Sequence, residues 1–77
     1  MTDAYVNVIV QPGAVQEAAA AIAESDAVSS VHLVTGDTDL IVQLDLASKD
    51  DIAAAVTEDI HSISGVVDTQ TNVAFEP

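Results

Sequence analysis

A β-hairpin in the middle of the chain constrains the fold more than any other feature of the sequence. Two runs rich in branched apolar residues flank the segment Gly36-Asp37-Thr38, a pattern typical of a tight connection between antiparallel strands. Gly36 can adopt a positive φ at little cost, so the turn can leave backbone N–H groups exposed. Asp37 and Asp39 place carboxylates beside those donors. This combination suits a zwitterion such as a free amino acid, and an ordinary turn with solvated acids is the alternative.

Apolar periodicity predicts a strand–helix–strand unit on each side of this hairpin's turn. Alternating residues predict strands, and apolar positions three and four residues apart predict amphipathic helices. Ser48 with Asp51 three residues later resembles the capping box of a helix start. The first strand is apolar at successive positions, so we expect both of its faces to be partly buried. The predicted strands cover residues 4–10, 28–35, 39–46 and 66–75, and the apolar helix stripes run over 15–22 and 52–60.

The resulting order β-α-β-β-α-β predicts an α+β fold of the ferredoxin-like type. Right-handed crossovers place both helices on one face of a four-stranded antiparallel sheet. The other face has no helix, yet it carries apolar residues, so we expect two copies of the chain to dimerise through it. The residues expected on that face are Tyr5, Ile9, Val34, Ile41 and Ala74, with Asn7, Gln43 and Gln70 among them.

The composition limits the class of protein. The chain has 77 residues, enough for one small domain covering 1–77, and 49% of them are hydrophobic. That is more than a thin core can bury, which again favours self-association. There is no cysteine, which excludes disulfides and thiolate metal sites. No apolar run is long enough for a membrane helix, and the N-terminus lacks the features of a signal peptide. We therefore expect a cytoplasmic protein with no membrane partner.

The charge balance is strongly acidic. Thirteen Asp and Glu residues face one base, Lys49, for a formal net charge of −12. High ionic strength screens such repulsion, so the composition favours a salt-rich cytoplasm, as in a halophile. An acidic mimic of nucleic acid is the alternative. Direct binding to nucleic acid is not expected, because it requires Lys and Arg side chains against the phosphates.

The sequence resembles the ligand-binding domain of the Lrp/AsnC transcription regulators, also called the RAM domain. The resemblance covers nearly the whole chain, and its most specific part is Thr35-Gly36-Asp37-Thr38-Asp39 between the second and third strands. Ser64-Gly65-Val66 and Thr69-Gln70-Thr71 follow at the expected spacing.

The resemblance implies a fold, a function and a set of ligand contacts. Domains of this family dimerise through their sheets, assemble into rings of eight or ten subunits, and hold an effector amino acid between dimers. Possible partners are therefore further copies of the chain, a free amino acid and full-length Lrp/AsnC regulators. Carried over to this chain, the ligand-binding residues are Thr35, Gly36, Asp37 and Asp39, with Thr69 and Thr71 nearby.

Two departures from the family pattern stand out. Lrp/AsnC regulators usually carry an N-terminal helix-turn-helix domain, whereas this sequence starts directly at the first strand, as expected for a stand-alone domain without its own DNA reader. The middle residue of the Thr-x-Thr segment is often Arg in the family and is Gln70 here, which removes a cationic partner for a ligand carboxylate.

Other chemistry finds little support in the residues. His32 and His61 have no second ligand at a suitable spacing, and the acid pairs Asp50-Asp51 and Glu58-Asp59 indicate solvated helix faces. No Ser-His-Asp arrangement is visible, and phosphate chemistry on this fold needs an Arg that the chain lacks. We expect no enzyme activity, no cofactor and no metal. Two hypotheses remain: an amino-acid-binding regulatory module, or a purely structural oligomerisation module without a ligand.

Overall fold

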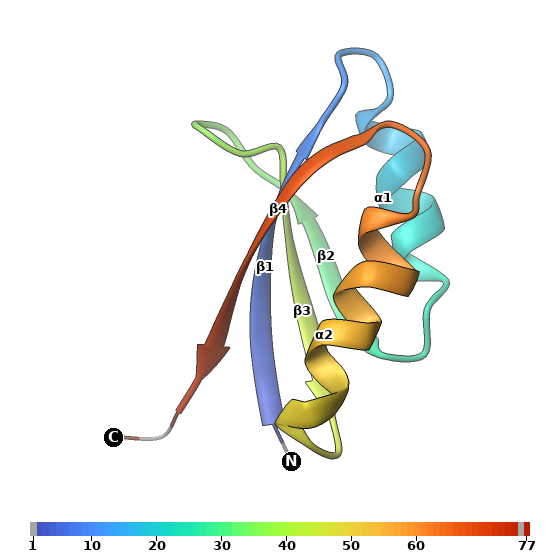
Figure 1. Cartoon of the computed structure of the whole chain (residues 1–77). Helices are drawn as coiled ribbons and strands as arrows, with labels where there is room; N and C mark the ends of the chain where they lie inside the picture. The colour runs from blue at the N-terminus through green and yellow to red at the C-terminus, as the bar shows by residue number, and fades with distance from the viewer. Residues whose placement is uncertain (1, 76) are drawn as a thin grey trace.

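The computed structural model describes residues 2–75 and 77 and confirms the predicted order of elements (Figure 1). The strands are β1 (Thr2–Val10), β2 (Val28–Leu33), β3 (Leu40–Leu46) and β4 (Val66–Ala74). Helix α1 spans Val15–Ala23. The second helix combines a 3₁₀ turn η1 (Lys49–Asp51), an α-helical turn α2 (Ile52–Ala55) and a π-helical turn η2 (Val56–His61). In this described part of the chain, no helix is long and apolar enough to cross a membrane.

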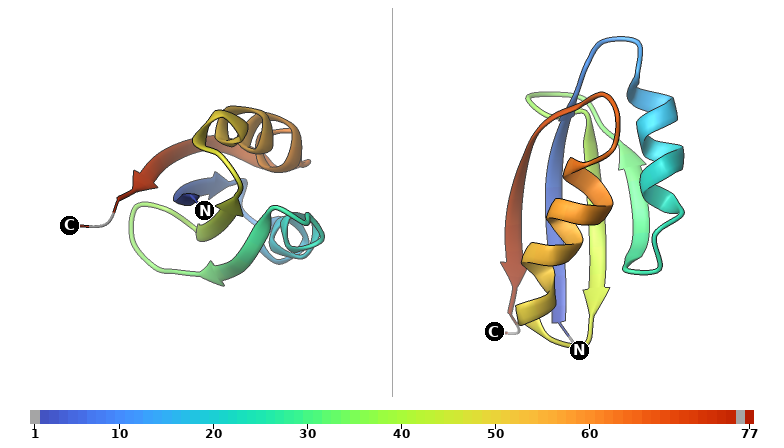
Figure 2. Two further views of the ribbon diagram at one scale, coloured as in Figure 1. Left: turned by 90° about the horizontal axis from the view of Figure 1, so that it is seen from below. Right: turned by 45° about the vertical axis from the view of Figure 1, so that its right-hand side comes forward.

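The four strands form one antiparallel sheet in the order β2-β3-β1-β4. Both helices cover the same face of this sheet, and the opposite face is open (Figure 2). The ferredoxin-like prediction is therefore confirmed. Because β1 and β3 are central, the loop that precedes β3 emerges beside the end of β1.

The core lies between the helices and the sheet. The predicted helix stripes are confirmed, since the buried helical residues fall on them. The buried apolar residues are Ala4, Val6, Val8, Val10, Ala18, Ala19, Ile22, Leu40, Val42, Leu44, Ile52, Ala55 and Ile60.

Burial of β1 is one-sided, contrary to the expectation that both of its faces are partly buried. Its even-numbered residues from Ala4 to Val10 are buried, whereas Tyr5 and Ile9 on the other face are 41% and 36% exposed. The physical reason is that the helices cover only one face, so a single chain offers nothing to bury the second apolar row.

Several element boundaries differ from the predicted ones. β1 begins at Thr2, β2 ends at Leu33, β3 begins at Leu40 and β4 ends at Ala74. The capping box is half formed. The Ser48 hydroxyl accepts a hydrogen bond from the N–H of Asp50 at 3.2 Å, and the N–H of Asp51 donates to the Ser48 carbonyl at 3.0 Å. These differences move strand ends by one to two residues and leave the topology unchanged.

A glycine fixes the turn that enters β4. Gly65 has φ +94°, and a Cβ atom there would lie 2.9 Å from the Cβ of Ala14. Its carbonyl accepts the N–H of Gln11 at 2.8 Å. Only glycine combines this backbone conformation with such a close approach to the start of α1.

Candidate functional site

The connection between β2 and β3 is longer than the predicted three-residue turn. Residues 34–39 lie outside both strands, and they form the loop at the upper left of Figure 1. The N–H of Val34 donates to the carbonyl of Asp39 at 3.0 Å, which closes the loop, and the N–H of Asp39 donates to the Val8 carbonyl at 2.9 Å. Gly36 has φ +113°, as its place in the predicted turn requires.

Asp39 has a structural contact in this loop. Its Oδ2 atom accepts the N–H of Val10 at 2.8 Å, in a partly buried position. Together with the bond from the Asp39 N–H to Val8, this contact attaches the end of the loop to the end of β1. One of the two predicted ligand carboxylates therefore already serves the fold through one oxygen.

The rest of the loop is open to solvent. Thr35, Gly36 and Asp37 are exposed, and Thr38 is half-buried. Among the described residues, no hydrogen bond takes up the amide N–H groups of residues 35–38. The loop thus presents free backbone donors next to the Asp37 carboxylate, the arrangement expected from the sequence.

Thr69 and Thr71 lie on the helix-covered side of the sheet. The register pairs Thr69 with Val8 and Thr71 with Val6, and both valines belong to the core beneath the helices. Both threonines are half-buried. The 34–39 loop precedes β3, and β1 separates β3 from β4, so the six predicted ligand-binding residues are distributed on both sides of β1.

Gln70 lies on the face of the sheet opposite to Thr69 and Thr71. It pairs with Asn7 on the open face of the sheet, between the two threonines in sequence but on the opposite side. A cation at position 70 would therefore stand on the open face, away from the side of the sheet that carries Thr71.

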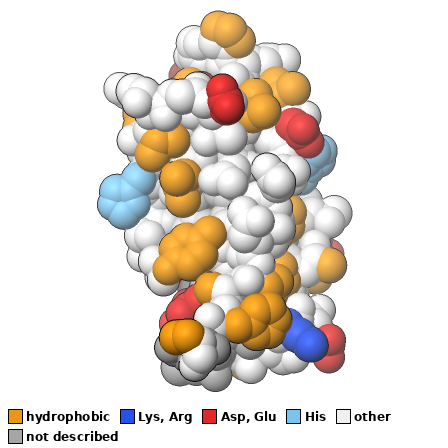
Figure 3. Space-filling model, turned by 90° about the vertical axis from the view of Figure 1, so that its left-hand side faces the viewer, with side chains coloured by type: hydrophobic (Ala, Val, Ile, Leu, Met, Phe, Trp, Pro, Cys, Tyr) orange, Lys and Arg blue, Asp and Glu red, His pale blue; other side chains and the backbone are white. Residues whose placement is uncertain are grey.

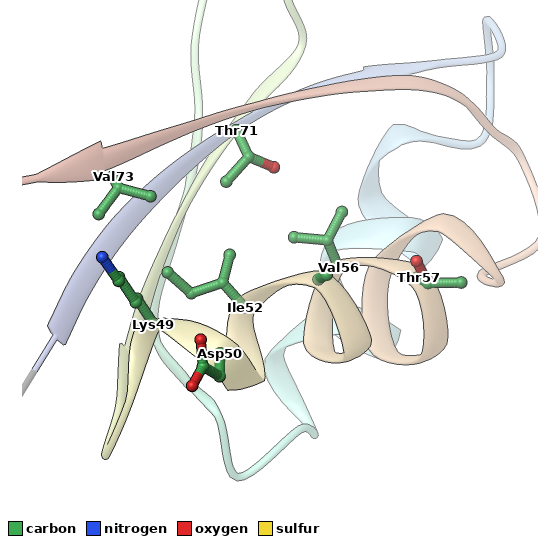
Figure 4. A pocket seen from close by; sticks show the side chains of 8 residues that line it. Lys49, Asp50, Ile52, Val56, Thr57, Thr71 and Val73 are labelled. Carbon is green, nitrogen blue, oxygen red and sulfur yellow. The ribbon is translucent and has the colours of Figure 1, made fainter.

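A groove between the second helix and β4 was not predicted from the sequence. It has a volume of about 540 Å³, and Figure 4 shows side chains from both elements turned toward each other across it. Lys49, the only Lys or Arg of the chain, would have been the signal for it in the sequence. The residues that line the groove are Lys49, Asp50, Ile52, Ala53, Val56, Thr57, Thr71 and Val73.

The histidines lie on separate elements. His32 pairs with Ile41 in the register of β2 and β3, and His61 ends the second helix. His61 is exposed. Over the residues that the structure describes, no three His, Cys, Asp or Glu side chains come close enough to hold a metal ion.

Comparison with solved structures finds proteins that share this fold. The protein TTHA0845 from Thermus thermophilus has a crystal structure with 35% identity and a TM-score of 0.94, over 100% of this chain and 96% of that one. Escherichia coli AsnC matches with a TM-score of 0.90 at 17% identity, over 99% of this chain but 52% of AsnC. A transcriptional regulator of Neisseria meningitidis, solved as a complex with L-methionine, matches with a TM-score of 0.85 at 23% identity, over 97% of this chain and 50% of the regulator.

A search among curated proteins gives no match. The family model for the Lrp/AsnC ligand binding domain matches residues 3–77, which is almost the whole chain. The relative at 35% identity is matched over nearly its full length. On these grounds the chain belongs to the Lrp/AsnC ligand-binding domain family.

Proposed function

We propose that this chain is an amino-acid-binding regulatory module that works without enzymatic chemistry. The observation that carries the proposal is the 34–39 loop, which offers free backbone N–H groups beside the exposed Asp37 carboxylate. Backbone donors suit the carboxylate of an amino acid, and Asp37 suits its ammonium. Family membership and the L-methionine complex of the Neisseria meningitidis regulator support the same ligand class.

The proposed binding site lies between subunits. The loop precedes β3 and Thr71 lies on β4, with β1 between these two strands, so we place the ligand between two copies, in contact with the loop of one and Thr71 of the other. Thr35, Gly36, Asp37 and Asp39 come from one copy in this arrangement, and Thr69 and Thr71 from a second. An amino acid would then bind only to the assembled protein, or bind it more tightly than a single chain.

The open face of the sheet supports assembly into dimers. The register places Tyr5, Asn7 and Ile9 of β1 on this face, beside Ile41 and Gln43 of β3. Figure 3 shows the side of the molecule away from the helices, with apolar side chains spread among polar ones. Burying such a surface against a second copy is favourable for a domain whose own core is small. We propose a sheet-to-sheet dimer that assembles further into an octamer or decamer.

Calorimetry with a panel of the common amino acids tests the ligand. We expect heat from at least one of them and a roughly 10- to 150-fold weaker affinity in Asp37→Asn, because a charge-assisted hydrogen bond is worth about 1.5–3 kcal/mol. Glu24→Gln is the matched control, since Glu24 is also exposed and lies outside the loop. If no amino acid gives heat at any protein concentration up to ~1 mM, the sensing proposal fails.

A second candidate is a purely structural oligomerisation module. The hydrogen bond from Val10 to Asp39 favours it, because it gives one of the two loop acids a role in folding alone. Light scattering separates the candidates. A structural module keeps one assembly size with every amino acid, whereas a sensor changes its size or its dissociation constant with one of them.

The proposed setting follows from the charge of the chain. Residues 1–77 would act as one domain, with any DNA contact supplied by full-length Lrp/AsnC regulators assembled with it, because one Lys and no Arg cannot neutralise phosphates. The net charge of −12 suits a salt-rich cytoplasm, the proposed location. Gel shifts with duplex DNA at low salt should show no binding by this chain alone.

A further inference from the structure

Strand β4 forms one free edge of the sheet. The order β2-β3-β1-β4 leaves its outer side without a neighbouring strand in the described part of the chain. Backbone groups along an antiparallel strand alternate between its two sides. On β1, the Val8 carbonyl and the Val10 N–H are both bonded to Asp39, which lies on the side of β3. The odd-numbered residues of β1 therefore bond to β4, and the even-numbered residues do not.

The register then identifies the free backbone groups of β4. Thr69, Thr71 and Val73 lie opposite even-numbered residues of β1, so their N–H and C=O groups point away from the sheet. The side chain of Asp68 supports this direction at one position, because its Oδ1 atom accepts the N–H of Thr69 at 2.9 Å. Within the described residues, Thr71 and Val73 thus present backbone donors and acceptors that no strand takes up.

The protection of this edge is confined to its beginning. Proteins usually protect a free edge with charged side chains, proline or a bulge. In β4 the register shifts beside Val10, and Asp68 is the only charged residue of the strand. Residues 70–74 carry no charge and no proline, so this half of the strand can pair with a further strand. The other free edge, β2, is shorter and has a register shift near its start.

On the helix side, the free half of β4 borders the groove beneath the second helix. Thr71 and Val73 line this groove from β4, and Ile52 and Val56 line it from the helix (Figure 4). A strand added to the sheet lies about 4.8 Å from β4, and every second one of its side chains stands on the groove side. Apolar side chains at those positions suit the isoleucine and valine lining of the groove.

On the open face, acidic residues flank the free half of β4. Asp68 pairs with Ile9 of the open face. Asp3 is also an odd-numbered residue of β1, and it pairs with Ala74 at the other end. The net charge of −12 adds a long-range attraction for cations. Lys49, the only base, lies on the opposite side, in the groove. Lys or Arg side chains on an added strand therefore suit the open face.

We propose that residues 70–74 of β4 bind an extended segment of a partner protein as an additional antiparallel strand. The segment carries apolar side chains on the groove side, alternating with Lys or Arg on the side of Asp3 and Asp68. Its backbone bonds to Thr71 and Val73 supply affinity, and its side chains supply specificity. A second copy of this chain does not fit the description, because the chain has one Lys and no Arg. The inference goes beyond the proposed function, since it requires no amino acid and adds a protein partner.

A set of synthetic peptides tests the backbone bonds. The probe is the acetylated and amidated peptide Thr-Lys-Val-Thr-Val-Lys-Thr, whose two valines lie opposite Thr71 and Val73. The N–H groups of these valines face β4 in an antiparallel ladder, so N-methylation of one valine removes a bond. N-methylation of the central threonine, whose N–H faces away, is the matched control. A third peptide, with Glu in place of both Lys residues, tests the charge.

Amide NMR spectra at about 0.1 M KCl follow the titrations. We expect the probe to shift the signals of residues 69–74 and to slow the solvent exchange of the Thr71 and Val73 N–H groups. The N-methylvaline peptide should bind about tenfold more weakly, and the N-methylthreonine peptide should bind like the probe. The Glu peptide should also bind about tenfold more weakly, and this difference should shrink at ~1 M KCl.

A protein variant tests the same edge independently. Val73→Pro removes an outward N–H that serves no ladder bond, which an edge strand tolerates. Val73→Ala is the matched control, because it shortens the side chain and keeps the N–H. Thermal midpoints establish that both variants are folded. We expect Val73→Pro to bind the probe about tenfold more weakly than Val73→Ala.

Three results would overturn the inference. The first is a probe that shifts no β4 signal at millimolar concentration. The second is equal binding of the two N-methylated peptides, which would show that the backbone edge is not used. The third is protection of the Thr71 and Val73 N–H groups that rises with protein concentration while the probe has no effect, because a second copy would then occupy the edge. None of these results affects the loop proposal, which Asp37→Asn tests separately.

Discussion

Gly65 occupies a position with no room for a side chain. Its φ of +94° already disfavours any other residue, and an added Cβ would meet the Cβ of Ala14 at 2.9 Å. Gly13 is the natural control, because its φ is +87° but a Cβ there would meet nothing within 4 Å. We expect Gly13→Ala to lower the free energy of unfolding by about 1 kcal/mol, and Gly65→Ala to lower it by about 2–4 kcal/mol.

Urea denaturation of the two variants measures the difference. The double variant Gly65→Ala with Ala14→Gly should recover part of the loss, because removing the Ala14 methyl relieves the clash but not the backbone strain. Equal losses in Gly13→Ala and Gly65→Ala would show that the contact between the β4 turn and α1 is not tight.

The contact of Asp39 with β1 leads to a second prediction about a single residue. Its Oδ2 atom holds the Val10 N–H at 2.8 Å, so Asp39→Ala leaves that partly buried donor unpaired, which costs about 1–3 kcal/mol. Asp39→Asn retains an acceptor oxygen, and we expect it to lose less than about 1 kcal/mol. Asp37→Ala should be nearly neutral, because Asp37 is exposed. A thermal midpoint for Asp39→Ala equal to that of Asp37→Ala would contradict the structural role of Asp39.

At the scale of elements, strands β1 and β3 place two acids directly opposite each other. Asp3 pairs with Asp45 in the antiparallel register, and within the described residues the buried Oδ1 atom of Asp45 has no hydrogen-bond partner. Like charges in this position destabilise a sheet by a few tenths of a kcal/mol up to about 1 kcal/mol. Asp3→Asn should therefore raise the free energy of unfolding by about 0.5 kcal/mol at ~0.1 M KCl.

The gain should shrink toward zero at ~2 M KCl, where the Debye length falls to about 2–3 Å. Glu24→Gln changes the same charge at an exposed site outside the strands and serves as the control. A stabilisation by Asp3→Asn that is the same at both salt concentrations would point to a cause other than repulsion between the two strands.

Helices and strands could be predicted where burial of one face produces a regular pattern of apolar residues. The stripe of Ala18, Ala19 and Ile22 placed α1 correctly, and alternation placed the four strands to within two residues at each end. Two features escaped prediction because they depend on contacts distant in sequence. The Asp39 side chain accepts the N–H of Val10 on β1, and the groove between the second helix and β4 brings together residues from both elements.

The candidate site was also predictable only in its local features. The local features of the loop, Gly36 with a positive φ and an exposed Asp37, follow from residues adjacent in sequence. The groove requires Lys49 and Val73 to meet although they are far apart in the chain, and no local pattern indicates this. The proposed interface between two copies cannot be predicted from local patterns either, because half of its residues would come from the second copy.

At the scale of the whole molecule, the strongest electrostatic effect is repulsion among 13 acidic residues with one base. Added salt screens this repulsion in the folded state more than in the expanded unfolded chain, so stability should rise with salt. We expect the thermal midpoint to climb by several degrees between ~0.1 M and ~2 M KCl. Because the effect is electrostatic, lowering the net charge should weaken it.

A triple variant tests that dependence on charge. Glu17→Gln, Glu24→Gln and Glu58→Gln change three exposed acids and take the formal net charge from −12 to −9. The variant should start with a higher midpoint at low salt and gain fewer degrees on going to ~2 M KCl. Sulfate adds a burial-strengthening effect to screening, so sulfate and chloride compared at equal ionic strength separate the two causes. If the triple variant and the unmodified chain gain equally from KCl, salt acts through apolar burial, and the acidic surface is not an adaptation to salt.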